Sequence, residues 1–148
     1  MKLPVIEFYS IDVTLPVFLT DRTKSWIDSI IRDKGKRTGE VFFLFCTDKF
    51  LLELNKKFLN HDTFTDILTF PDSENPDLLS GEIYISLERV WENAKKFSQD
   101  KESELHRVMI HGILHLLGYE DGTDKDTRIM RTEEDDALKK LNNHLKIR

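Results

Sequence analysis

The sequence predicts a single α+β domain, residues 1–148, in which a small mixed β-sheet of about four strands is covered by about five helices. The 148 residues are 39% hydrophobic and include ten phenylalanines, a composition typical of one folded domain. Strand patterns and amphipathic helix patterns follow one another in an irregular order, which favours an α+β arrangement. Residues 102–117 are apolar around most of a helical cylinder, so we expect a buried central helix there.

Two elements are predicted near the N-terminus. Residues 3–13 mix apolar and polar side chains in the manner of a strand near the edge of a sheet. Residues 21–34 predict a helix, which Thr20 or Asp21 can cap and Gly35 can end. The apolar face of this helix consists of Trp26, Ile27, Ile30 and Ile31.

The middle of the chain predicts three strands and a helix. Residues 41–47 are β-branched and aromatic, which indicates a buried strand. Asp48 is expected to cap a short helix that runs to about residue 58. Residues 66–70 predict a strand that Pro71 stops, and the polar stretch to residue 81 predicts a loop. Residues 82–86 alternate between apolar and polar side chains, which predicts a half-buried strand.

The last third of the chain predicts three helices. Ser86 is expected to cap the first, which runs to about residue 97. The second is the buried helix at residues 102–117, and Gly118 is placed to end it. Its apolar side chains are Leu105, Val108, Met109, Ile110, Ile113, Leu114, Leu116 and Leu117. Residues 126–145 predict a final amphipathic helix through Met130, Ala137, Leu138, Leu141 and Leu145.

The composition excludes several classes of protein. The single cysteine, Cys46, excludes a disulfide framework and a four-cysteine metal site, and we expect no disulfide-linked partner. The longest apolar run, residues 41–46, is far shorter than the roughly 20 residues of a membrane helix, so no membrane association is expected. The N-terminal residues carry Lys2, Glu7 and Asp12 rather than a secretory signal, so a reducing, cytoplasmic location is expected.

The net charge of −5 argues against binding nucleic acid by overall electrostatic attraction. Three short clusters of lysine and arginine could form local basic patches, although solvated surface side chains are the better interpretation of each cluster alone. They are Lys34-Lys36-Arg37, Lys56-Lys57 and Lys95-Lys96.

The predicted central helix carries one polar stripe, in which Ser103, Arg107, His111 and His115 recur every four residues. Residues four apart differ by about 40° around the helix axis and roughly 6 Å along it, so the two imidazoles can point at one site. This spacing is typical of two metal ligands on one helix, although it also arises by chance or in a core pair. Arg107 could hold a phosphate, or could form an ion pair with the acidic C-terminal helix.

A third ligand is expected just beyond this helix. Gly118 lets the chain turn back sharply, and Asp121 follows it by three residues. Two imidazoles and a carboxylate leave a fourth position for water or substrate, as in an open catalytic site. Zinc suits these donors, and nickel, iron and manganese stay open. Glu120 is less suited, because adjacent side chains do not readily point inward together; the alternative for Asp121 is a solvated loop residue or a cap.

Gly112 occupies the position that carries the general base in the metallopeptidase motif H-E-x-x-H. Because glycine has no side chain, a metal-bound water would lack that base, and peptide hydrolysis is disfavoured. Phosphodiester cleavage depends more on the metal as a Lewis acid and on cations that hold the phosphate. The glycine either lets a bulky substrate approach the metal or allows close packing of the helix.

The histidine motif, H-G-I-L-H-L-L-G-Y at residues 111–119, resembles the signature H-G-x-L-H-L-x-G-Y of the YbeY family of bacterial endoribonucleases. The resemblance covers about residues 40–140. Further similar segments are Leu54-Asn55, T-D-I-L-T-F-P at residues 65–71, G-E-I-Y-I at residues 81–85, and Met130 with Glu133-Glu134.

The resemblance implies a metal-dependent endoribonuclease that cleaves single-stranded RNA. It implies one zinc or other divalent transition-metal ion, with His111, His115 and Asp121 as ligands. It also implies a role in small-subunit (16S) ribosomal RNA maturation and ribosome quality control, with ribosomal RNA and the small ribosomal subunit as partners. Two alternatives stay open: a zincin-like metallopeptidase, and a non-catalytic, metal-stabilised ribosome assembly factor with a fourth protein ligand.

The chain departs from the family pattern at two positions. The family motif ends in G-Y-D-H, whose histidine is the third ligand, and Asp121 stands in that place here. Aspartate is a harder, anionic ligand, which is expected to shift the metal preference and lower the Lewis acidity of the site. Leu59 stands where the family commonly has an arginine thought to hold RNA, and Lys56, Lys57 or His61 could take over that contact.

Overall fold

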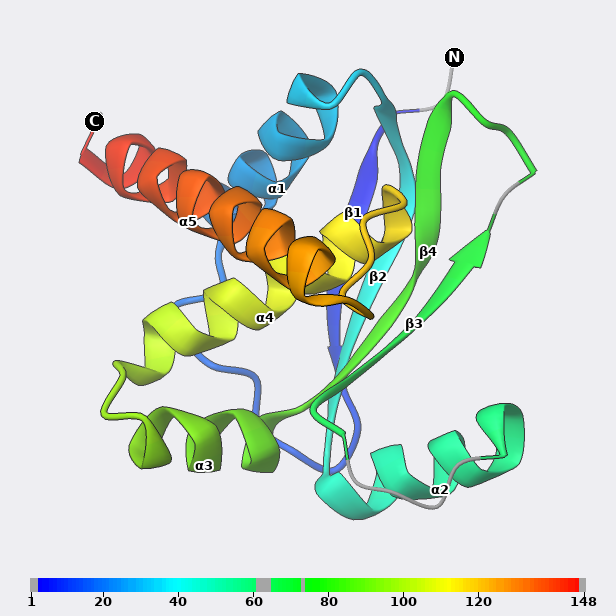
Figure 1. The fold of residues 1–148 in the computed structure, drawn as a ribbon, viewed down its shortest axis with the longest axis vertical. Coiled ribbons are helices and arrows are strands. Elements are labelled where there is room, and N and C mark those ends of the chain that lie inside the picture. The colour runs from blue at the N-terminus through cyan, green and yellow to red at the C-terminus, as the bar shows by residue number, and fades with distance from the viewer. Residues whose placement is uncertain (1–2, 61–64, 73, 147–148) are drawn as a thin grey trace.

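The computed structural model describes residues 3–60, 65–72 and 74–146, and a four-stranded mixed sheet forms its centre (Figure 1). The strand order is β1-β2-β4-β3; β1 and β4 run parallel to β2, and β3 runs antiparallel to β4. The strands are β1 (Val5–Ser10), β2 (Arg37–Cys46), β3 (Ile67–Asp72) and β4 (Leu78–Ser86). This sheet and the five helices around it confirm the predicted α+β class.

The helices cover the two faces of the sheet unequally. Four helices share one apolar core with inward-facing strand residues such as Phe43 and Ile83. The helix α2 packs on the opposite face, where Leu51 joins Cys46 and Leu68 in a smaller cluster. The helices are α1 (Asp21–Asp33), α2 (Asp48–Leu59), α3 (Leu87–Lys96), α4 (Lys101–Leu116) and α5 (Asp124–Lys146). None of the described helices is long and apolar enough to cross a membrane.

The helix α4 lies between α5 and the sheet (Figure 1), and 8 of its 16 residues are buried. Asp100 caps its start by accepting a hydrogen bond from the Ser103 amide. Gly112 faces the sheet, where an added Cβ would lie 2.8 Å from Cγ2 of Ile83 and 2.9 Å from Cδ1 of Ile67. Of the two roles considered for Gly112, the structure therefore shows close packing of the helix.

Three local predictions are wrong. Thr47 rather than Asp48 caps α2, since the Thr47 hydroxyl accepts a hydrogen bond from the Phe50 amide. Pro71 does not stop β3 but lies within it, because β3 is an edge strand, where proline is tolerated. The predicted loop to residue 81 is partly strand, since β4 already begins at Leu78 and pairs with β3.

Candidate metal centre

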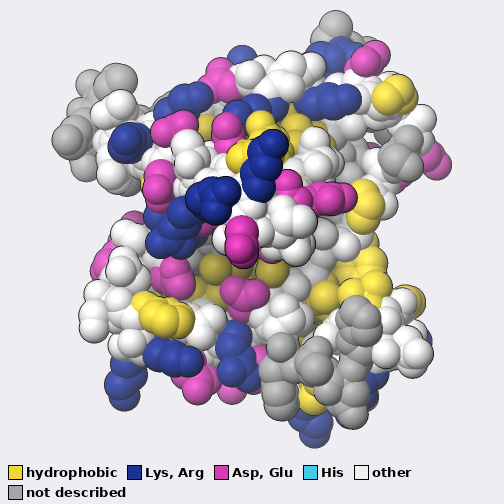
Figure 2. Space-filling view, in the orientation of Figure 1, with side chains coloured by type: hydrophobic (Ala, Val, Ile, Leu, Met, Phe, Trp, Pro, Cys, Tyr) yellow, Lys and Arg dark blue, Asp and Glu magenta, His cyan; other side chains and the backbone are white. Residues whose placement is uncertain are grey.

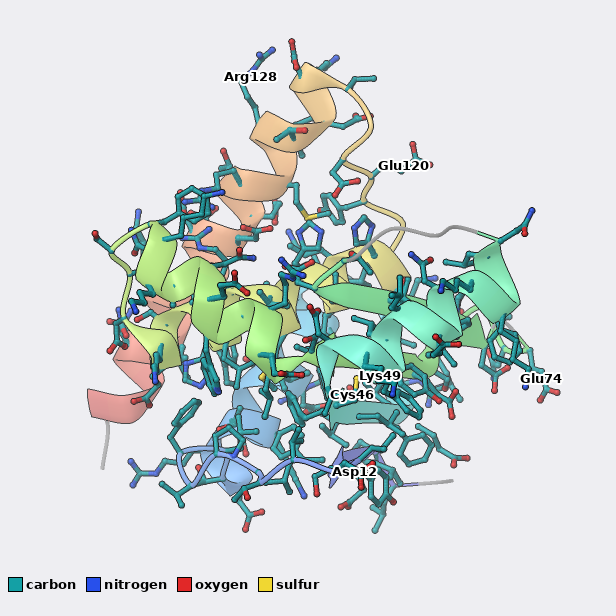
Figure 3. All side chains as sticks on the ribbon, turned by 90° about the horizontal axis from the view of Figure 1, so that it is seen from below. Asp12, Cys46, Lys49, Glu74, Glu120 and Arg128 are labelled. Carbon is teal, nitrogen blue, oxygen red and sulfur yellow. The ribbon has the colours of Figure 1, made fainter. Side chains whose placement is uncertain are left out.

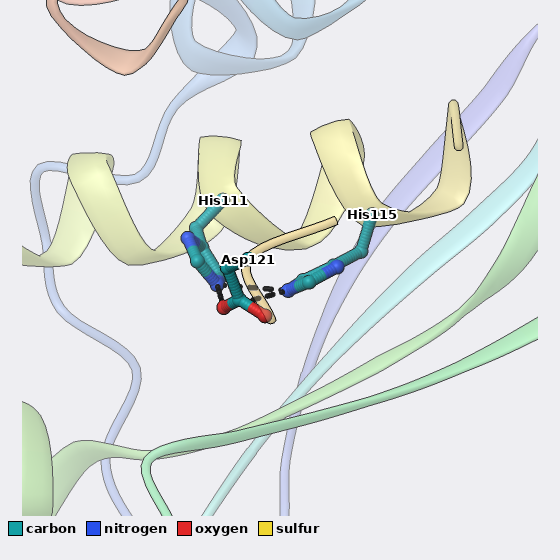
Figure 4. Close-up of side chains that lie close together, drawn as sticks. All are labelled: His111, His115 and Asp121. Carbon is teal, nitrogen blue, oxygen red and sulfur yellow. Dashed lines mark hydrogen bonds and ion pairs between the residues drawn. The ribbon is translucent and has the colours of Figure 1, made fainter. Parts of the chain in front are cut away.

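The helix α4 and the loop after it bring the three predicted metal ligands together (Figure 4). Nε2 of His111 lies 2.9 Å from Nε2 of His115. Oδ2 of Asp121 lies 3.3 Å from Nε2 of His111 and 3.5 Å from Nε2 of His115. Glu120, the less suited candidate, is exposed on the outside of the loop (Figure 3) and lies outside this group.

A sharp turn at the end of α4 returns the chain to the histidines. Gly118 has a φ of +102°, a backbone conformation that residues with a Cβ atom rarely adopt. The Tyr119 amide donates a hydrogen bond of 2.9 Å to the Leu114 carbonyl, which closes the last turn. The Asp121 carbonyl then accepts a hydrogen bond of 3.1 Å from the Thr127 hydroxyl, which ties the loop to α5.

Hydrogen bonds on the other ring nitrogen orient both imidazoles. Nδ1 of His111 lies 2.7 Å from Oε2 of Glu134, and Nδ1 of His115 lies 3.1 Å from the Tyr119 carbonyl oxygen. Both partners accept, so each Nδ1 donates its proton outward and each Nε2 faces the shared point. A cation at this point would be within reach of both Nε2 atoms, which is the donor arrangement of a metal site.

The separations of the donor atoms fit a divalent transition metal. Atoms that hold zinc tetrahedrally at about 2.0–2.2 Å lie roughly 3.3 Å apart. The three separations here range from 2.9 to 3.5 Å. Within the part of the chain that the structure describes, this group consists of three residues that could hold a metal ion. In a tetrahedral site, three protein ligands leave one position for water or substrate.

Glu134 on α5 connects the predicted ligand His111 to Arg107. Its side chain is only 6% exposed; Oε2 accepts from His111, and Oε1 accepts from Nη1 of Arg107 at 2.8 Å. Burial works to raise the pKa of Glu134, but the hydrogen bonds from His111 and Arg107 bring it below its usual value. Burial likewise opposes the charge on His111, yet the hydrogen bond to Glu134 and the charges of Glu134 and Asp121 raise its pKa.

This role of Glu134 is not predicted from the sequence, where Glu134 appears only in one of the segments similar to the YbeY family. A usable signal exists, because Glu134 lies on the same helical face as Met130, Ala137 and Leu141, all of which are buried. A carboxylate within an apolar stripe needs a buried partner, since an unpaired buried charge is costly. The polar stripe of α4 supplies that partner.

Arg107 has acidic partners at both ends of its guanidinium group. Nη1 lies 2.8 Å from Oε1 of Glu134, and Nη2 lies 2.6 Å from Oδ1 of Asp135. Of the two alternatives for Arg107, the ion pair with the C-terminal helix is the one observed.

A cleft of about 400 Å³ opens beside the metal ligands and is lined by His111 and Asp121. Its charged lining also includes Asp66, Glu104, Arg107, Arg131 and Glu134. Burial raises the pKa of both Asp66 and Glu104. No local pattern marks these two acids as neighbours, because β3 and α4 bring them together from distant parts of the sequence. Figure 2 shows basic and acidic side chains interspersed over the visible face, without a large patch of either sign.

The three basic clusters contribute no residue to the described lining of this cleft. Leu59 is 44% exposed at the end of α2. Lys56 and Lys57, considered as replacements for the family arginine, are not among the cleft residues, and His61 lies outside the described residues. Several lysines of these clusters have local partners: Lys34 pairs with Glu133, Lys36 with the Pro76 carbonyl, and Lys56 with Glu53.

Comparison with known proteins identifies the family. Residues 12–142 match the family described as Endoribonuclease YbeY. The chain is 50% identical over 115 residues to Endoribonuclease YbeY of Flavobacterium psychrophilum, and the matched region covers 78% of this chain and 81% of the relative. It is 44% identical over 133 residues to Endoribonuclease YbeY of Porphyromonas gingivalis, and the matched region covers 90% of this chain and 87% of the relative. The solution structure of TM1509 from Thermotoga maritima superposes with a TM-score of 0.69 at 28% identity, covering 96% of this chain and 92% of that one. The chain therefore belongs to the YbeY endoribonuclease family.

Proposed function

We propose that the chain is a metal-dependent endoribonuclease that cleaves single-stranded RNA. The observation that carries the proposal is the convergence of His111, His115 and Asp121 beside an open cleft, in a chain of the YbeY family. Zinc is the proposed ion, because two imidazoles and a carboxylate at these separations suit it. Another divalent transition metal could use the same donors.

Each residue of the centre has a distinct part in the proposed activity. His111, His115 and Asp121 hold the ion, which when bound supplies Lewis-acid polarisation or activated water for phosphodiester hydrolysis. Glu134 and the Tyr119 carbonyl keep the Nδ1 protons of the two histidines, so that both Nε2 atoms stay available for coordination. The cleft beside His111 and Asp121 is the proposed entry for the RNA backbone.

The proposed biological role is maturation of small-subunit ribosomal RNA and ribosome quality control in the bacterial cytoplasm. The relatives named Endoribonuclease YbeY in two bacterial species support this role. Ribosomal RNA and the small ribosomal subunit are the proposed partners. Since the net charge is −5, affinity for RNA must come from local contacts around the cleft rather than from overall charge.

The two alternative functions have less support. In a zincin-like peptidase a glutamate would replace Gly112, but even a Cβ there would lie 2.8 Å from Ile83, on the side that faces the sheet. A non-catalytic assembly factor would close its metal site with a fourth protein ligand, whereas the described residues supply three.

The function is tested by cleavage of a single-stranded RNA with purified, zinc-loaded protein. The wild type should cleave the RNA and leave casein intact, and His115→Ala should lose cleavage while its circular dichroism spectrum is retained. Ser103→Ala is the matched control, because Ser103 lies on the same stripe of α4 but outside the ligand group. Cleavage by His115→Ala at the wild-type rate would place the activity elsewhere, and digestion of casein would favour the peptidase.

Elemental analysis of the same preparations tests the ligand set. The wild type should retain one divalent ion per chain, and Asp121→Ala should retain much less, because only two protein ligands remain. Equal metal contents would exclude Asp121 as a ligand.

A further inference from the structure

We propose that Arg131 binds a phosphate group of the substrate next to the metal centre, an inference that rests on the proposed ribonuclease function. Arg131 is on α5 and lines the same cleft as the ligands His111 and Asp121. The residue before it, Met130, is 2% exposed and anchors this turn of α5 in the core. The backbone of Arg131 is therefore held in place while its side chain reaches the cleft.

Arg131 and Arg107 are the cationic side chains among the described residues of the cleft lining, and their surroundings differ. Arg107 is 20% exposed and has ion pairs of 2.8 and 2.6 Å with Glu134 and Asp135. The Arg131 side chain is 63% exposed, and its Nη1 lies 3.9 Å from Oε1 of Glu134. A contact of this length on an exposed side chain is weak, so the Arg131 guanidinium can turn toward an incoming anion.

The charge of the cleft favours a cationic side chain that can turn toward the substrate. The carboxylates of Asp66, Glu104, Asp121 and Glu134 outnumber the two guanidinium groups, which leaves a formal charge of −2. A divalent ion brings this charge to zero but does not make it positive. An RNA backbone that reaches the metal brings further negative charge, which a guanidinium offsets with paired hydrogen bonds to phosphate oxygens. Arg131 is the cleft residue placed to supply them.

The test measures the phosphate contact through the salt dependence of binding. Zinc-loaded wild type and Arg131→Gln are titrated with a fluorescein-labelled oligothymidylate, a single-stranded DNA that offers phosphates without 2′-hydroxyl groups. For a single strand, one phosphate contact contributes about 0.7 to the slope of log affinity against log salt, or roughly threefold in affinity between about 50 and 200 mM. Arg131→Gln should bind more weakly at low salt, and its affinity should fall about threefold less than that of the wild type over this range.

Two further variants separate a phosphate contact from a general effect of charge. Arg128→Gln removes the same charge from the same helix, but Arg128 extends into solvent (Figure 3) and does not line the described cleft, so it should match the wild type. Arg131→Lys keeps the charge without the planar fork and should keep the salt slope with weaker binding. In RNA cleavage, Arg131→Gln should raise KM more than it lowers kcat, and its zinc content should equal that of the wild type.

The outcomes distinguish this inference from the proposed function. If Arg131→Gln has the affinity and salt slope of Arg128→Gln, the phosphate contact is overturned and the ribonuclease proposal stands. A loss of zinc affinity with an unchanged salt slope would also overturn the inference, because Arg131 would then act through Glu134. If the wild type fails to cleave RNA while the salt slope depends on Arg131, the ribonuclease proposal fails and the phosphate site remains.

Discussion

The side chain of Glu134 joins the proposed metal ligand His111 on α4 to the C-terminal helix. A glutamine there keeps the shape, but its amide accepts hydrogen bonds at one end only, so it cannot accept from both His111 and Arg107. Loss of either bond loosens the orientation of His111. We therefore expect Glu134→Gln to bind zinc about 10- to 100-fold more weakly, as measured by competition with a chromogenic chelator.

The neighbouring Glu133 provides the control for this measurement. Glu133 pairs with Lys34 and does not line the described cleft, so Glu133→Gln should keep the wild-type zinc affinity. Equal zinc affinities for the two glutamine variants would show that the carboxylate of Glu134 does not orient His111.

His106 is a buried histidine that takes no part in the metal centre. It is 5% exposed, and its ring lies edge-on to Phe18 and Trp26, with ring centroids 5.4 and 5.5 Å away. Its Nε2 has no hydrogen-bond partner among the described residues. Burial lowers the pKa of His106 to about 4, with only a small opposing effect of Asp100.

This pKa predicts a loss of stability in acid. The unfolded chain protonates His106 below about pH 6.5 and the folded chain only below about pH 4, so acidification within this window favours unfolding. The titration of His106 alone should lower the free energy of unfolding by about 2 kcal/mol between about pH 7 and about pH 5. In urea denaturation with a metal chelator present, His106→Leu should lose about 2 kcal/mol less than the wild type over that interval. Identical losses in the two proteins would mean that His106 titrates at its ordinary pKa.

At the scale of elements, the approach of α4 to the sheet depends on Gly112. A valine there would place methyl groups where the Cβ alone already lies 2.8 Å from Ile83 and 2.9 Å from Ile67. We expect Gly112→Val to lower the free energy of unfolding by about 2 kcal/mol or more, because overpacking of a core typically costs 1–3 kcal/mol. Denaturation by urea measures this change.

Ser103→Val is the matched substitution on an exposed position of the same helix. It introduces the same β-branched side chain without a clash, so its cost should stay within about 1 kcal/mol. If Gly112→Val were no less stable than Ser103→Val, α4 would not be held close to the sheet at this point.

At the scale of the whole molecule, the metal centre ties three segments of the chain together. Its ligands come from α4 and the following loop, and Glu134 and Thr127 extend the connections to α5. If zinc is the ion of this site, as we propose, it binds the folded arrangement, and about 100-fold excess over Kd should stabilise the fold by about 3 kcal/mol and raise Tm by several degrees. Differential scanning calorimetry with zinc and with a chelator measures the shift.

The stabilisation should depend on the complete ligand set. Asp121→Ala should show a much smaller rise in Tm with zinc than the wild type, since two imidazoles alone hold the ion weakly. A rise in Tm of equal size in both proteins would place the stabilising ion at another site.

Regular patterns within short segments were enough to predict most elements and part of the site. The apolar periodicity of α1 predicts which of its faces is buried, and the four-residue spacing of His111 and His115 predicts their convergence, since both follow from helix geometry. Gly118 and the short offset to Asp121 add the third ligand for the same reason. The prediction that Pro71 ends β3 is wrong because only the sheet determines that this strand lies at an edge.

The sequence by itself determined the fold class, the buried helix and the convergence of His111, His115 and Asp121, because local geometry relates residues that are near one another in the chain. Only the tertiary structure decided that Glu134 orients His111, that Arg107 is held in short ion pairs, and that Arg131 lies largely exposed at the cleft with only a long contact to Glu134. It also decided that Gly112 faces the sheet and not the ligands. These relations join distant segments, and their distances depend on how the helices pack against one another and against the sheet, which no local periodicity encodes.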